Sequence, residues 1–341
     1  MASLIVKMCR NPSLQTYNSL QKLNYVWNVP KNKPLVRLFN SEGKDAASRA
    51  ARRATLKERA MQPTTGTPYR IGAGAVAGAS VLGMGALCYY GLGFSNEPSL
   101  MDHATVWPQY VRDRVKATYM YFGGSVMITA ASALAAFRSP IIMNLVTRGG
   151  LMGLAISLGA MLGTGILCQS IPYTGGAGAK QIAWLLHTAT MGAVLAPICF
   201  MGGPLLIRAA WYTAGIVGGL SAVAVCAPSD KFLYMGAPLA MGLGVVFVSS
   251  IGTMFLSPAS ALGAGLYSIS LYGGLILFSG FLLYDTQRIV AQAERYTTSP
   301  DLYGVRPYDP INACLSIYMD TLNIFIRIAT ILAGGGNQRK K

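Results

Sequence analysis

Two aspartates are the residues of this sequence that could take part in ion or proton chemistry, because each lies in or next to a long apolar run. Asp285 follows the uncharged run 232–284, and Asp320 lies near the middle of the last apolar run, 311–333. If the fold brings them together, the two carboxyl groups cannot easily be ionised at the same time. They would then share one proton and titrate as a unit. Such a pair could sense pH, or exchange protons for a hard cation, which prefers oxygen ligands. The alternative for Asp285 is an interfacial residue where its span ends.

Asp320 belongs to a polar stripe along the last apolar run. At about 100° per residue, the polar residues of this run fall within an arc of about 80°. Facing lipid would be costly for such a stripe, so we expect it to face the bundle interior or a water-filled cavity. Arg327 is a possible partner of Asp320, but two helical turns separate them. The stripe consists of Asn312, Ser316, Asp320, Asn323, Arg327 and Thr330.

His187 is a further polar residue inside an apolar run. We favour a packed, hydrogen-bonded histidine over a proton relay. The six cysteines are scattered without the spacing of a metal site or a disulfide framework. The serines show no nucleophile-elbow pattern, and no glycine-rich loop follows a strand. We therefore expect neither an enzyme nor a bound cofactor.

The amino-acid composition indicates a membrane protein that crosses the bilayer several times. Hydrophobic residues make up 52% of the 341 residues and charged residues only 12%, with a mean hydropathy of +0.42. A soluble protein of this length needs about twice that charged fraction, so a soluble globular enzyme is excluded. A bilayer crossing needs roughly 20 apolar residues. We predict eight crossings, at about 71–93, 119–137, 151–171, 182–201, 209–227, 235–256, 262–284 and 311–333.

The N-terminal region is strongly basic. Residues 1–60 hold 12 of the 28 Lys and Arg residues but only three acids, which is typical of a mitochondrial or plastid transit peptide. The alternative is a solvated basic tail that touches anionic lipid or nucleic acid. Because no RNA-binding motif accompanies it, we expect no nucleic-acid partner. We divide the chain into a leader (1–60), a linker with the first transmembrane helix (61–104) and a transmembrane bundle (105–341).

Several sequence segments resemble the Bax-inhibitor family of membrane proteins. Those that carry the family likeness are Phe281–Gln287, Tyr308–Asn312 and Leu315–Asp320. Those that resemble its mitochondrial branch most closely are Tyr110–Arg114, Ala183–His187 and Gly203–Tyr212. The likeness runs from about residue 105 to the C-terminus. It implies an all-α, seven-helix bundle in the mitochondrial inner membrane, preceded here by one additional transmembrane helix.

The resemblance also implies a function. The family is associated with calcium leak or calcium/proton exchange controlled by a hydrogen-bonded aspartate pair, which maps onto Asp285 and Asp320 as a transient calcium site. Asn312, Ser316 and Asn323 would line the approach. The implied roles are cristae organisation, cytochrome c retention and resistance to apoptosis, with an inner-membrane AAA protease as a partner. The alternative is a scaffold or regulator of such partners that transports nothing.

One feature of the family has no obvious counterpart in this chain. Some members place an arginine from an early helix against the aspartate pair as a latch. The predicted spans 119–137 and 151–171 contain no charged residue. Arg327 is the substitute that the sequence offers.

Overall fold

A computed structural model describes residues 56–91, 107–148, 150–176, 178–228, 231–296 and 308–336. Apart from an isolated bridge between Pro63 and Ser260, the regular structure of these residues is helical. Eight of the helices are long and apolar enough to cross a membrane, as predicted. Most of the predicted leader, residues 1–55, lies outside the described residues.

The helices follow one another with short interruptions. In chain order they are α3 (Leu56–Met61), α4 (Thr67–Gly91), α6 (Gln109–Arg138), α7 (Pro140–Arg148), α8 (Gly150–Ser170), α9 (Ala179–Leu195), η1 (Ala196–Met201), α10 (Gly203–Cys226), η2 (Leu233–Met235), α11 (Gly236–Phe255), α12 (Ala261–Ser268), η3 (Ile269–Gly273), α13 (Gly274–Arg295) and α14 (Pro310–Gly336).

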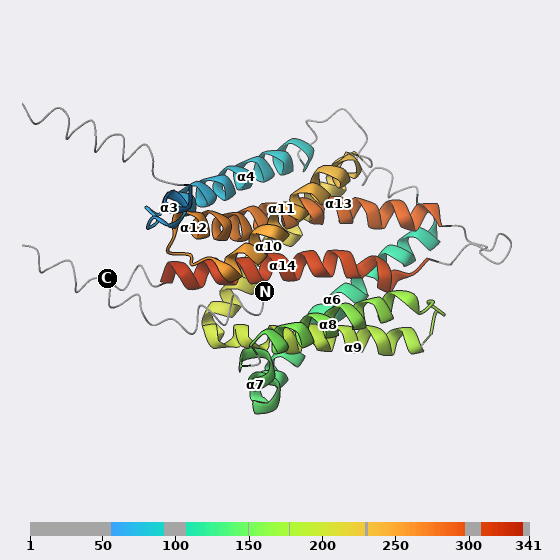
Figure 1. Ribbon diagram of the computed structural model, residues 1–341. Coiled ribbons are helices and arrows are strands. Elements are labelled where there is room, and N and C mark those ends of the chain that lie inside the picture. Colours follow the sequence, from blue (N-terminus) through green and yellow to red (C-terminus); the bar gives the residue numbers. More distant parts are fainter. Residues whose placement is uncertain are drawn as a thin grey trace, which may run out of the picture.

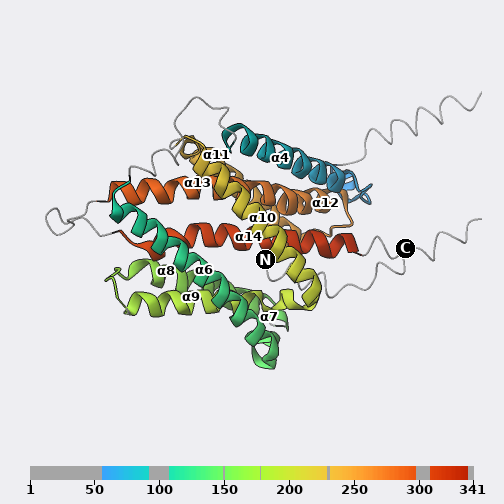
Figure 2. The same ribbon diagram turned by 180° about the vertical axis from the view of Figure 1, so that it is seen from behind.

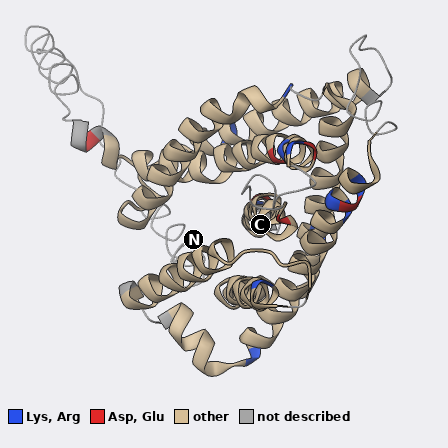
Figure 3. Ribbon diagram, turned by 90° about the vertical axis from the view of Figure 1, so that its right-hand side faces the viewer, with Lys and Arg blue, Asp and Glu red and all other residues tan. Residues whose placement is uncertain are grey.

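Helix α14 is the central element of the bundle. It packs against α6, α10 and α13, and the view along the bundle shows it encircled by other helices (Figure 3). In its most apolar stretch 67% of the residues are buried, against 0% in α4, which lies at the edge of the bundle (Figures 1 and 2). Helix α14 is therefore surrounded by protein, as its polar stripe requires, because unpaired polar groups are costly against lipid.

Two helices extend well beyond their predicted spans. Helix α6 begins at Gln109 rather than near residue 119, and α13 continues to Arg295 rather than ending at residue 284. Arg114 explains part of the difference, because its Nη1 donates to the carbonyl oxygens of Ala293 and Tyr296, each at 2.8 Å. A cation at a helix C-terminus is favourable there. Asp285 consequently lies within α13, not at its end.

The seventh crossing is built from three pieces. The predicted gap between the spans 235–256 and 262–284 is present, since α11 ends at Phe255 and α12 begins at Ala261. The Ser260 hydroxyl caps α12 by accepting a hydrogen bond from the Gly263 N–H at 3.1 Å. Between α12 and α13, residues Ile269–Gly273 form η3, a π-helical segment. Such segments leave backbone carbonyls available to other partners and are frequent at functional sites.

Candidate ion and proton site

The structure brings the two aspartates together inside the bundle. The carboxyl groups of Asp285 on α13 and Asp320 on α14 lie within hydrogen-bonding reach of each other, and the residues are only 4% and 5% exposed. Asp285 Oδ1 and Asp320 Oδ2 are buried without a hydrogen-bond partner among the described residues. Ionised carboxylates only accept hydrogen bonds, so neither group can donate to the other unless one of them carries a proton.

Two further side chains approach the pair. Ser316, one turn before Asp320 on α14, interacts with the carboxyl group of Asp285. Arg288 Nη1 lies 3.7 Å from Asp285 Oδ1, an ion pair too long for a hydrogen bond. The Arg288 side chain is 49% exposed, so water screens its charge. Sequence reasoning missed Arg288, although its spacing of three residues from Asp285 places both on one helix face.

A cavity of about 580 Å³ lies between α8, α9, α13 and α14. Tyr173, Tyr308 and Asp309 line it at the end of the bundle where α14 begins, and Ser316 and Arg288 line it next to the aspartate pair. Neither aspartate is part of the lining. The cavity therefore leads from one end of the bundle to the side chains that contact the pair.

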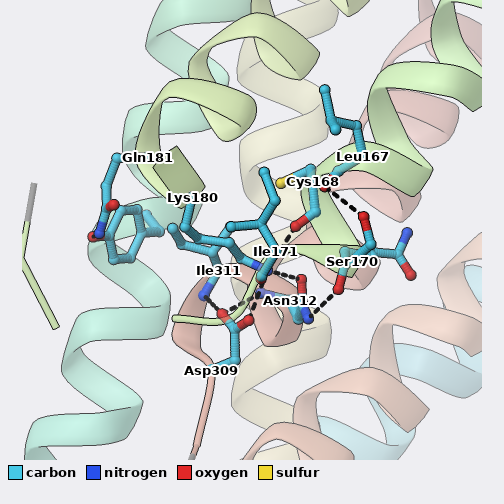
Figure 4. Close-up of polar contacts among 11 residues, drawn as sticks. Leu167, Cys168, Ser170, Ile171, Lys180, Gln181, Asp309, Ile311 and Asn312 are labelled. Carbon is cyan, nitrogen blue, oxygen red and sulfur yellow. Dashed lines mark hydrogen bonds and ion pairs between the residues drawn. The ribbon is translucent and has the colours of Figure 1, made fainter. Parts of the chain in front are cut away.

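A buried lysine binds residues that line this cavity at the end of the bundle where α14 begins. Lys180 Nζ lies 2.7 Å from Asp309 Oδ2, and the lysine side chain is 0% exposed (Figure 4). It also donates to Asn312 Oδ1 at 2.7 Å and to the carbonyl oxygens of Cys168 and Ile171 at 2.7 and 3.0 Å. Four oxygens thus surround one ammonium group, which joins the last turn of α8 and the first turns of α9 and α14.

Asp309 has a second role at the start of α14. Its Oδ1 accepts hydrogen bonds from the backbone N–H groups of Ile311 and Asn312, both at 3.0 Å. With Pro310 in the first helical position, this is an N-cap arrangement that fixes where α14 begins. Since α14 carries Ser316 and Asp320, the cap and the lysine together set the position of the site.

Tyr308 packs beside this cap. Its hydroxyl lies 2.7 Å from Thr118 Oγ1, and the guanidinium of Arg114 stacks over its ring at 5.5 Å. Burial raises the pKa of Tyr308 to about 12, although the hydrogen bond to Thr118 and the charge of Arg114 act in the opposite direction. The cavity is therefore lined here by a neutral phenol at physiological pH.

The remaining candidate residues have separate places. His187 lines the cavity with its Nδ1 3.0 Å from Thr164 Oγ1. Asn312 lines the outer end and binds Lys180. Asn323 does not line the cavity; its Oδ1 accepts a hydrogen bond from Arg327 Nη1 at 3.0 Å. The approach to the pair is thus lined by Asn312 and Ser316 and not by Asn323.

Arg327 does not take the place of the latch. Its guanidinium donates to the carbonyl oxygens of Ser270 and Asn323 and to the Asn323 side chain, and it lies over the ring of Phe278. These partners lie on the side of the pair away from the cavity. The prediction that Arg327 substitutes for the latch is therefore wrong, because two turns of helix separate it from Asp320 and other acceptors satisfy it.

The donor set limits how strongly the site could hold a metal ion. No group of three or more His, Cys, Asp and Glu side chains gathers anywhere in the described part of the chain. Ca²⁺ takes about six to eight oxygen ligands. Two carboxylates and the Ser316 hydroxyl supply only part of this number, and water from the cavity would supply the rest. Such a site suits a cation in transit better than a resident one.

Comparison with known sequences decides the family. The family described as "Inhibitor of apoptosis-promoting Bax1" matches residues 111–338, which is more than half of the chain. The chain belongs to the Bax inhibitor family. Growth hormone-inducible transmembrane protein of Rattus norvegicus is 57% identical over 288 residues, covering 84% of this chain and 82% of the relative. Bax inhibitor 1 of the same organism is 28% identical over 251 residues, covering 72% and 95%.

The Bax inhibitor match also shows which helices of this chain lie outside the family region. Its region, 111–338, spans the helices from α6 to α14 and contains Asp285, Asp320 and the Lys180 cluster. Helices α3 and α4 precede it. An uncharacterised protein of Helicobacter pylori, 29% identical over 224 residues, covers 64% of this chain and 85% of the relative. The bundle that holds the site is thus the family unit, and α4 is an addition to it.

Sequence reasoning also missed Lys180, Asp309 and Arg114. All three lie outside the predicted spans, and none was among the candidate site residues. A signal for Asp309 was present, because Asp followed by Pro before an apolar run is typical of an N-cap and first helical turn. Nothing local marks Lys180, since its carboxylate partner is 129 positions further along the chain.

Proposed function

We propose that this protein is a mitochondrial inner-membrane calcium/proton exchanger or pH-sensitive calcium leak that works through Asp285 and Asp320. The observation that carries the proposal is a buried carboxyl pair with two unsatisfied oxygens beside a cavity. A carboxyl pair that holds one proton cannot also hold a divalent cation with both groups. Loss of the proton frees both carboxylates for calcium, so the two ions compete for one place.

The surrounding groups support this cycle. Ser316 contacts Asp285 and lines the cavity, so its hydroxyl can pass a cation between cavity and pair. Arg288 is the nearest cation to the pair and is half exposed, which lets it move aside as calcium enters. His187 and Asn312 are polar residues that line the cavity. These residues form the proposed ion and proton path, with calcium and protons as cargo rather than cofactors.

The basic leader supports a mitochondrial location, and the family resemblance supports the inner membrane. With eight crossings, both ends of the helical part lie on one side, which is the matrix side if the leader enters the matrix. The cavity then opens toward the intermembrane space. Roles in cristae organisation, cytochrome c retention and resistance to apoptosis, and contact with an AAA protease, belong to the same proposal.

The test is calcium flux in liposomes reconstituted with the purified protein, measured with calcium and pH indicators inside. Asp285→Asn and Asp320→Asn should each abolish calcium flux and the proton movement that accompanies it. Asp113→Asn is the matched control, because it makes the same chemical change at an exposed position on α6. Flux that stays pH-sensitive and unchanged in both pair variants would overturn the proposal and favour the scaffold alternative, in which the aspartates only fasten α13 to α14.

A further inference from the structure

Arg327 is a buried cation without an acidic partner in the described part of the chain. It is 5% exposed within a membrane-spanning helix, and neither of the ion pairs there involves it. Arginine stays protonated in proteins. An intramembrane charge is costly, and one that is retained in the interior usually marks an ion path. Its position relative to the aspartate pair therefore has functional meaning.

The arginine lies beyond the pair as seen from the cavity. Along α14, Ser316 lines the cavity, Asp320 follows one turn later, and Arg327 follows two turns after that, about 10 Å further on. Helix α13 runs alongside, and its Phe278, seven residues before Asp285, contacts the guanidinium at 4.6 Å. The order along the bundle is thus cavity, carboxyl pair, fixed positive charge.

The guanidinium is held rigidly in this position. Nε donates to the Ser270 carbonyl oxygen at 3.2 Å, and Nη1 donates to the carbonyl and side-chain oxygens of Asn323 at 3.1 and 3.0 Å. Ser270 belongs to the π-helical segment η3. A Cβ added at Gly274 would overlap the guanidinium, so the absence of a side chain there makes room for it.

We propose that Arg327 is the positive charge that closes the path beyond the aspartate pair to cations. In this conformation the pair would exchange calcium and protons with the cavity side, while the arginine repels cations from the other side. Fixed arginines act as electrostatic barriers of this kind in selective pores. Movement of the guanidinium out of its place between η3 and α14 would then open the second side.

The additional helix α4 supports the segment that holds the arginine. The Ser268 hydroxyl, just before η3, donates to the Pro68 carbonyl oxygen in the first turn of α4 at 2.7 Å. Tyr69 packs edge-on against Tyr267, and Gly72 lies so close to Tyr272 that a Cβ could not fit without movement. Helix α4 lies outside the family match and beside α12 (Figure 1). It is therefore placed to hold η3, and with it Arg327, in the closed arrangement.

The inference rests on the proposed function, and the same liposome assay tests it. Arg327→Gln removes the charge and should raise calcium efflux about tenfold, since a unit charge about 10 Å away still acts strongly in a low dielectric. Gly274→Ala keeps the charge but displaces it and should raise efflux as well. Gly273→Ala is the matched control, because its Cβ would make only an ordinary 3.7 Å contact with Ile269.

The outcomes separate the two proposals. If the wild type releases calcium and Asp320→Asn abolishes this efflux, the proposed function stands. In that case, unchanged efflux in Arg327→Gln or in Gly274→Ala overturns the proposal that Arg327 is a barrier. If Arg327→Gln does not fold, the result for Gly274→Ala against Gly273→Ala decides. If Asp320→Asn carries calcium as the wild type does, the proposed function itself fails, whatever the arginine variants show.

Discussion

The ammonium group of Lys180 lies 2.7 Å from the carboxylate of Asp309, with both groups at the junction of three helix ends. The lysine side chain is 0% exposed, and its other neighbours are the amide oxygen of Asn312, the carbonyl of Cys168 in α8 and the carbonyl of Ile171 just after α8. The pair thus joins the outer wall of the cavity to the first turn of the helix that carries Asp320.

Removal of the lysine charge should destabilise the bundle strongly. Lys180→Met leaves the Asp309 carboxylate, which is only 17% exposed, without its charged partner, and breaking a buried ion pair in this way costs about 3–5 kcal/mol. We expect a lower thermal midpoint in detergent, measured by loss of the monodisperse peak after heating. The double variant Lys180→Met with Asp309→Asn should recover much of the loss, because no uncompensated charge remains. Equal destabilisation of both variants would contradict this explanation.

The two roles of Asp309 can be separated by comparing two substitutions. Asp309→Asn keeps a side-chain oxygen that can cap α14, whereas Asp309→Ala removes both the cap and the ion pair. We expect the alanine variant to be less stable than the asparagine variant by about 1 kcal/mol, the usual value of an N-cap. Ser260→Ala, which removes the cap of α12 without disturbing an ion pair, should cost a similar amount. Both are measured as thermal midpoints.

His187 should act as a packed residue and not as a proton relay. Its Nδ1 lies within hydrogen-bonding distance of Thr164 Oγ1. A Cβ added at Gly165 would lie only 3.3 Å from the imidazole ring, so the ring is closely packed against this glycine. His187 lines the proposed path, and His187→Gln keeps a polar, hydrogen-bonding side chain in that lining. We therefore expect this variant to leave proton-coupled calcium flux unchanged while lowering the thermal midpoint. Loss of the proton component with calcium movement intact would show that the imidazole relays protons.

Tyr308 should make stability depend on alkaline pH. Burial raises its pKa from 10.0 in the unfolded chain to about 12 in the folded protein. Because its pKa is raised on folding, the contribution of the protonated Tyr308 phenol to the stability of the folded protein is complete below pH 10. This contribution is lost as the pH rises from about 10 through about 12. Tyr308→Phe should remove this part of the alkaline loss, at a cost of about 1 kcal/mol at neutral pH for the hydrogen bond with Thr118. Thermal midpoints between pH 8 and pH 12 would check this, and an unchanged alkaline profile would contradict it.

Much of the membrane architecture could be predicted from the sequence. Eight apolar runs predict eight crossings because each bilayer span needs a certain length of apolar chain, and this requirement is local. The inward orientation of Asp320 and Ser316 follows from helical periodicity, which is also local. The helix ends were less accurate: Arg114 lies inside α6, because the carbonyl groups of Ala293 and Tyr296, at the C-terminal end of α13, satisfy it in place of water.

What the sequence by itself determined, therefore, is the number of crossings and the face on which the polar residues lie. The tertiary structure decided which polar groups meet. Asp285 pairs with Asp320, Lys180 with Asp309, and Arg327 with a carbonyl of η3 instead of with either acid. The physical reason is that a buried polar group needs a partner, but helical spacing limits only the partners on its own helix, and packing between distant helices selects the others.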